Sequence, residues 1–174
     1  MAQSGEQISN GAGMSLRFLK TAADTDGELL EMEATYETSS GRPPEHFHPR
    51  QSERFEILEG TVSARIDGEE RKLRAGETLE IEAGVPHTMW NQGPGRARTN
   101  WQSRPALRTE DFFETTFRLT REAAADEKGM GRLQVAVLAG TYRDEFRPTS
   151  PSQPVQAVVL AVLAPLGRLM GRKA

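Results

Sequence analysis

Apolar and polar residues alternate through the first part of this chain. Between residues 30 and 37 one face of the predicted strand carries Leu30, Met32, Ala34 and Tyr36, and the other face carries glutamates. The same alternation runs through residues 62–66 and 79–81. Asp67-Gly68 favours a tight hairpin, because both central residues of a type I′ turn need positive φ. Closely spaced short strands of this kind predict a mainly β fold, an antiparallel sandwich or barrel over residues 14–105.

A helical period replaces the strand period after Pro105. We predict about three helices, the first beginning at Thr109, the second over residues 131–146 and the third over 155–170. A stiff linker before the third helix contains Pro148, Pro151 and Pro154. We expect residues 106–174 to form an extension that packs on the barrel or in a dimer interface.

The first residues of the chain carry little apolar content. Residues 1–13 are rich in Gly, Ser, Gln and Asn, so we expect them to be a disordered lead. They contain neither the basic segment nor the apolar segment of a secretory signal, which favours a cytoplasmic location.

Composition limits the chemistry that the chain can perform. It has 174 residues, a formal charge of −3, three histidines and no cysteine. The length suits one domain. The lack of cysteine excludes disulfides, thiol nucleophiles and iron–sulfur clusters. The near-neutral charge argues against a nucleic-acid partner. Any transition-metal site built on imidazoles must therefore use His46, His48 and His87.

Two of these histidines share one face of an extended segment. His46 and His48 are two residues apart, so their imidazoles point to the same side and Phe47 points to the other. Glu53 lies five residues after His48, which is the wrong parity for a straight strand, and Pro49 favours a break that would bring it back. Three imidazoles and one carboxylate suit Fe, Mn, Ni, Cu or Zn.

The spacing of these residues resembles a known family. The segment from Gly41 through His46, His48 and Glu53 is similar to the first cupin motif in its germin-like version, and the second motif is matched by Gly76, Gly84, His87 and Asn91. Two positions depart from the pattern: one residue is missing before His46, and Glu82 replaces the usual proline.

The resemblance to the cupin superfamily implies a single jelly-roll barrel that commonly forms a homodimer. It also implies one divalent transition metal, with Fe or Mn favoured and Zn, Ni or Cu as alternatives. The metal ligands it implies are His46, His48, Glu53 and His87.

Strand parity directs further side chains into the barrel. The expected substrate-binding residues are Tyr36, Phe55, Met89 and Trp101. They predict an apolar, aromatic-lined pocket, and the equally simple alternative is that they are core residues. Tyr36 is the candidate catalytic general acid.

These features favour a metal-dependent Fe(II) or Mn oxygenase that acts on a small organic substrate. The aromatic lining narrows the expected substrate to an aromatic compound. A metal-dependent isomerase, cyclase or decarboxylase remains an alternative within the enzyme class. A non-catalytic module that binds a small ligand is the alternative outside it, because fold does not fix function.

The last predicted helix has two interpretations. Val155–Met170 is nearly all apolar, and Arg168, Arg172 and Lys173 make the end of the chain basic. A helix that is apolar on most sides is usually packed against protein, which we favour. The alternative is a contact with a membrane surface, where basic residues meet anionic lipid.

Overall fold

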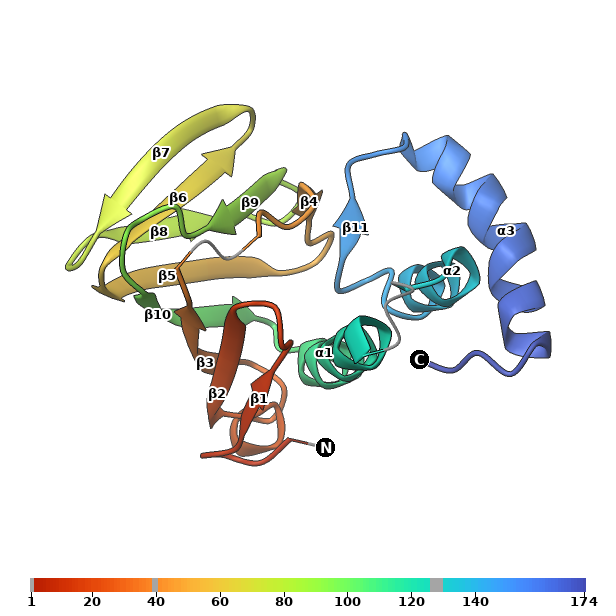
Figure 1. The fold of residues 1–174 in the computed structure, drawn as a ribbon, viewed down its shortest axis with the longest axis horizontal. Coiled ribbons are helices and arrows are strands. Elements are labelled where there is room, and N and C mark those ends of the chain that lie inside the picture. The colour runs from red at the N-terminus through yellow and green to blue at the C-terminus, as the bar shows by residue number, and fades with distance from the viewer. Residues whose placement is uncertain (1, 39–40, 126–129) are drawn as a thin grey trace.

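The computed structural model describes residues 2–38, 41–125 and 130–174, and it contains two antiparallel sheets and three helices (Figure 1). The six-stranded sheet has the order β1 (Gln7–Ser9), β2 (Met14–Lys20), β3 (Leu30–Tyr36), β10 (Ala97–Arg104), β5 (Ser52–Glu59) and β8 (Thr78–Ile81). The five-stranded sheet has the order β11 (Arg147–Pro148), β4 (His46–Phe47), β9 (His87–Trp90), β6 (Thr61–Ile66) and β7 (Glu69–Arg74). A short 3₁₀ helix, η1, spans Ala23–Thr25. The predicted antiparallel barrel is therefore confirmed.

The barrel core lies between the two sheets and follows the predicted parity. Along β3 every second side chain is buried, and Leu30 and Met32 are fully inaccessible. Leu16 and Phe18 of β2 join them from the same sheet, and Val62 joins them from the other. The predicted hairpin between β6 and β7 is present, because Asp67 and Gly68 both have positive φ, 47° and 83°.

The lead before the barrel is ordered in part, which differs from the expectation for residues 1–13. Gln7–Ser9 pairs with β2 in antiparallel register, Gln7 opposite Arg17. Strand β1 is held by backbone hydrogen bonds to β2, which do not require apolar side chains. The polar composition of residues 1–13 therefore did not indicate a strand.

The helices are α1 (Thr109–Ala125), α2 (Arg132–Thr141) and α3 (Gln153–Leu169). The second predicted helix, over residues 131–146, was too long, because the chain turns after Thr141. The predicted proline linker was also wrong in part, since Pro148 lies in β11 opposite His46. Strand β11 carries the chain back onto the barrel between α2 and α3 (Figure 1).

A buried amide fastens the first helix to the barrel. The Gln51 Nε2 donates to the Pro105 carbonyl at 2.7 Å and to the Thr109 hydroxyl at 2.8 Å. Phe113 and Phe117 of α1 then pack into the barrel core. The helical extension is thus anchored where β10 ends.

The third helix is the outermost element and packs mainly on α2 (Figure 1). Ala164 and Gly167 are its buried residues, while most of its large apolar side chains are exposed. We expected the extension to pack on the barrel or in a dimer interface. Within this chain α3 packs mainly on α2 rather than on the barrel, and burial in a dimer interface stays a prediction. In the described part of the chain, no helix is both long and apolar enough to cross a membrane.

Candidate metal centre

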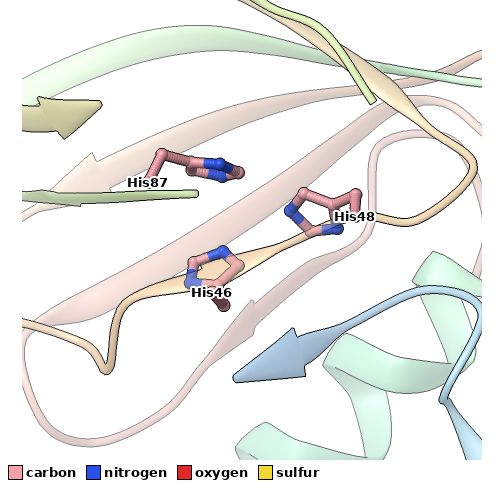
Figure 2. A group of neighbouring side chains, drawn as sticks. All are labelled: His46, His48 and His87. Carbon is pink, nitrogen blue, oxygen red and sulfur yellow. The ribbon is translucent and has the colours of Figure 1, made fainter. Parts of the chain in front are cut away.

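The three histidines meet at one point inside the barrel. His46 lies in β4 directly opposite His87 of β9, and His48 follows β4 by one residue. One ring nitrogen from each residue lies within 4.8 Å of the others. Figure 2 shows the three rings arranged around one shared space. Adjacent antiparallel strands bring distant residues this close only when their register is fixed, as it is here.

Each imidazole is oriented by a backbone carbonyl. The Nδ1 of His46 donates to the Pro44 carbonyl and that of His87 to the Val85 carbonyl, both at 2.9 Å. The Nδ1 of His48 donates to the carbonyl of Glu145, at 2.5 Å. A proton held on Nδ1 leaves a lone pair on Nε2, which is the arrangement typical of metal-binding histidines.

The second nitrogen of His48 supports the same interpretation. His48 is 6% exposed, and its Nε2 makes no hydrogen bond within the described residues. A buried polar atom without a hydrogen bond is costly, and a metal ion at this place would satisfy it. The donor set therefore fits a divalent transition metal.

Glu53 reaches the cluster from the other sheet. Its Oε2 lies 2.9 Å from the His87 Nε2, and its Oε1 lies 3.2 Å from the His48 Nε2. The Trp101 Nε1 donates to Oε1 at 2.9 Å. The parity mismatch in the sequence disappears because β4 and β5 belong to different sheets, so the chain between them crosses the barrel.

The charges of the cluster suit ligands. Burial alone would raise the pKa of Glu53, but the neighbouring His48 and His87 outweigh it and lower that pKa to about 2. Burial, helped by His48 and His87, lowers the pKa of His46 to about 3, so this ring is neutral. For His87 burial also acts to lower the pKa, but the hydrogen bond to Glu53 overcomes it and the pKa is raised. A metal ion would therefore have to displace the proton that His87 Nε2 shares with Glu53.

A cavity of about 440 Å³ opens next to the imidazoles. The expected substrate-binding residues all line it, namely Tyr36, Phe55, Met89 and Trp101. They are also buried members of the core, so both sequence interpretations describe the same side chains. Burial first, and then the Glu53 carboxylate, raise the pKa of the Tyr36 hydroxyl, which therefore keeps its proton.

The sequence did not predict the far wall of this cavity. It comes from the helical extension, through Phe112, Phe113, Phe117 and Phe146. The Phe146 ring stacks on His46 with centroids 4.4 Å apart and planes at 27°, and Phe112 stacks on Phe146. The residues that hold and cover the site thus include Glu145 and Phe146, which lie outside both motifs.

The two antiparallel sheets form a jelly-roll barrel, and the imidazole cluster between them is a candidate metal site. Residues 32–101 match the family described as Cupin domain. The structure of an RmlC-like cupin from Shewanella frigidimarina shares the fold, with a TM-score of 0.53, 21% identity and coverage of 64% of this chain and 92% of that one.

Two curated proteins are similar over part of their length. The tetracenomycin polyketide synthase protein TcmJ of Streptomyces glaucescens is 34% identical over 85 residues, which are 48% of this chain and 57% of that protein. An oxidoreductase of Arthrobotrys oligospora is 34% identical over 61 residues, which are 34% of this chain and 24% of that protein. The chain spans less than two thirds of either relative.

Proposed function

We propose that this cupin is a metal-dependent enzyme that acts on a small aromatic substrate, with an Fe(II) or Mn oxygenase as the favoured reaction. The observation that carries the proposal is the convergence of three imidazoles, each oriented through its Nδ1, beside an aromatic-lined cavity. The oxidoreductase among the relatives supports the choice of reaction class.

The chain's own residues divide into two groups by role. His46, His48, His87 and Glu53 would hold the metal, which supplies Lewis-acid polarisation or, as iron or manganese, electron transfer. The phenylalanines of α1 and Phe146 exclude water and present ring faces on which a planar substrate stacks. Tyr36 holds a proton at its hydroxyl in the cavity wall, which makes it the candidate general acid.

Non-oxidative chemistry at the same site is the second candidate. A protonated Tyr36 beside a cluster of metal ligands suits an isomerase, cyclase or decarboxylase, in which a proton moves and no oxygen is consumed. The relative from a polyketide synthase makes polyketide-type phenols and ketones sensible substrates to test for either reaction. A non-catalytic ligand-binding module would keep the cavity but turn over neither kind of compound.

Metal analysis tests the site. Purified wild-type protein is expected to bind close to one equivalent of Fe or Mn, and His48→Ala is expected to lose it. Gln134→Ala is the matched control, because Gln134 is a buried polar residue of α2 outside the cavity. Equal metal content in wild type and His48→Ala would contradict the ligand assignment.

Oxygen uptake tests the reaction. Metal-loaded protein is expected to consume oxygen with at least one phenolic compound of a panel, and Tyr36→Phe separates proton transfer from metal binding because it removes only the hydroxyl. Conversion of a substrate without oxygen uptake would support the isomerase or lyase alternative. Tight binding without conversion would support the non-catalytic module.

A further inference from the structure

The outward face of α3 is a continuous apolar stripe. Its members recur every three or four residues along the helix, and they are Val155, Val158, Val162, Leu166 and Leu169. Their exposure ranges from 45% for Leu166 to 86% for Leu169. Exposed apolar patches of this kind usually mark a binding surface.

The opposite face of α3 is locked against α2, so the stripe cannot turn inward. Gly167 is buried, and a Cβ at this position would lie 2.7 Å from Val137 Cγ2 and 3.0 Å from the Leu133 carbonyl oxygen. Such a close approach between two helices needs a residue without a side chain. The packing therefore fixes the rotation of α3 and holds the stripe in solvent.

The charge around the stripe is strongly one-sided. Residues 146–174 contain four basic side chains and no acidic one, which are Arg147, Arg168, Arg172 and Lys173. Since the whole chain carries −3, residues 1–145 carry −7. A negatively charged surface would attract the basic end of the chain and repel the acidic first 145 residues, so it would orient the molecule.

A groove beside the stripe brings two of these basic side chains together with Arg143. A cavity of about 420 Å³ between α2, β11 and α3 is lined by Arg143, Arg147 and Arg168. The Arg147 Nε donates to the Arg143 carbonyl, and Arg168 donates to the Thr141 hydroxyl. Among the described residues, no carboxylate pairs with any of these three arginines. Guanidinium groups without carboxylate partners are suited to phosphate oxygens.

We propose that α3 and its arginine-lined groove bind the surface of an anionic lipid bilayer. The apolar stripe enters the boundary between headgroups and acyl chains, and the basic residues meet lipid phosphates. A second copy of the chain fits less well, because a stable interface uses about 20–30 residues a side and the stripe offers far fewer. The basic side chains would also gain no acidic partner from a second α3.

Vesicle co-sedimentation of the full chain tests this proposal. We expect the protein to sediment with phosphatidylcholine vesicles that contain phosphatidylglycerol and to remain in solution with phosphatidylcholine alone. High salt is expected to release it in part, because salt screens the headgroup attraction. Equal binding to both kinds of vesicle, or binding to neither, would overturn the proposal.

Two pairs of variants separate the apolar and the charged contributions. Leu169→Ser is expected to weaken partitioning by at least about tenfold, and Leu58→Ser is its control, because Leu58 is an exposed apolar residue of the barrel. The double change Arg172→Gln and Lys173→Gln is expected to weaken it about 30-fold. Its control is the same double change at Arg71 and Lys72 of β7.

The molecular mass in solution distinguishes lipid binding from the alternative, in which a second copy of the chain covers the stripe. Light scattering is expected to show a mass that Leu169→Ser leaves unchanged. A dimer that Leu169→Ser dissociates, together with no vesicle binding, would show that a second copy covers the stripe and would overturn the proposal. Far-UV circular dichroism of each variant checks that the helices remain folded.

Discussion

The barrel and the α2–α3 pair use apolar residues in different ways. In the barrel, large side chains such as Leu30, Met32 and Phe55 fill the space between two sheets and are 0–2% exposed. Where α3 meets α2, the buried residues of α3 are the small Ala164 and Gly167, and most of its large residues face outward. An apolar pattern in the sequence thus shows which residues share a face, but not whether the chain itself covers that face.

Truncating one residue in each region measures this difference most directly. Met32→Ala is expected to lower the free energy of unfolding by about 2–5 kcal/mol, because it leaves a cavity in a packed core. Val162→Ala removes an exposed side chain and is expected to change it by less than about 0.5 kcal/mol. Urea unfolding followed by circular dichroism measures both. A similar loss for the two variants would mean that α3 is covered in solution.

Adding a methyl group tests the small-residue contact. Gly167→Ala is expected to destabilise the α2–α3 packing by about 1–3 kcal/mol, since the new Cβ would overlap Val137. Amide hydrogen exchange in α3 measures this opening. Gly140→Ala is the matched control, because its Cβ would lie 3.4 Å from the Ala164 Cβ and the helix gains propensity. Equal protection of α3 in both variants would argue against the close contact.

The extension also acts on the candidate metal centre, and a ring deletion tests that link. Phe146→Ala removes the ring that stacks on His46 and is expected to weaken metal affinity about tenfold. Phe112→Ala removes a ring from the same cavity that has no ring contact with a histidine among the described residues, so it is expected to keep the affinity. Calorimetric titration with Mn²⁺ measures both. Equal affinities would show that Phe146 only closes the cavity.

The smallest expected effect lies where α1 joins the barrel. Burial raises the pKa of Glu110, although its carboxylate accepts a hydrogen bond from the Ala22 backbone. A carboxyl group whose pKa is raised on folding stabilises the protein at low pH, and this contribution is lost as the pH rises above 4.5. Partial solvent screening keeps it below about 1 kcal/mol. Glu110→Gln is expected to show a flatter pH profile in urea unfolding.

Much of the barrel could be predicted from the sequence because strand parity is a local property. Alternation along Leu30–Tyr36 identified the buried face, and Asp67-Gly68 identified the hairpin. His46 and His48 shared a face for the same reason. The position of Glu53 could not be predicted in this way. Parity holds only within one strand, and Glu53 lies in β5, which belongs to the other sheet.

The rest depended on contacts that leave no periodic signal. β11 has two residues, so neither its existence nor its pairing with His46 could be predicted from a pattern. The carbonyl of Glu145 is a backbone group, and any residue type supplies it. For α3 the sequence predicted a helix, but the close contact at Gly167 decided which side faces solvent.

The two residues that lead into β11, Glu145 and Phe146, bear on how the protein is made. The carbonyl that orients His48 lies 97 residues further along the chain, and the ring on His46 follows it immediately. Chains fold from the N-terminus as they are synthesised, so the three imidazoles leave the ribosome well before Glu145 and Phe146. Until that segment emerges, His48 lacks its Nδ1 acceptor and His46 lacks its stacked ring. Completion of the site is thereby timed by the length of chain already translated.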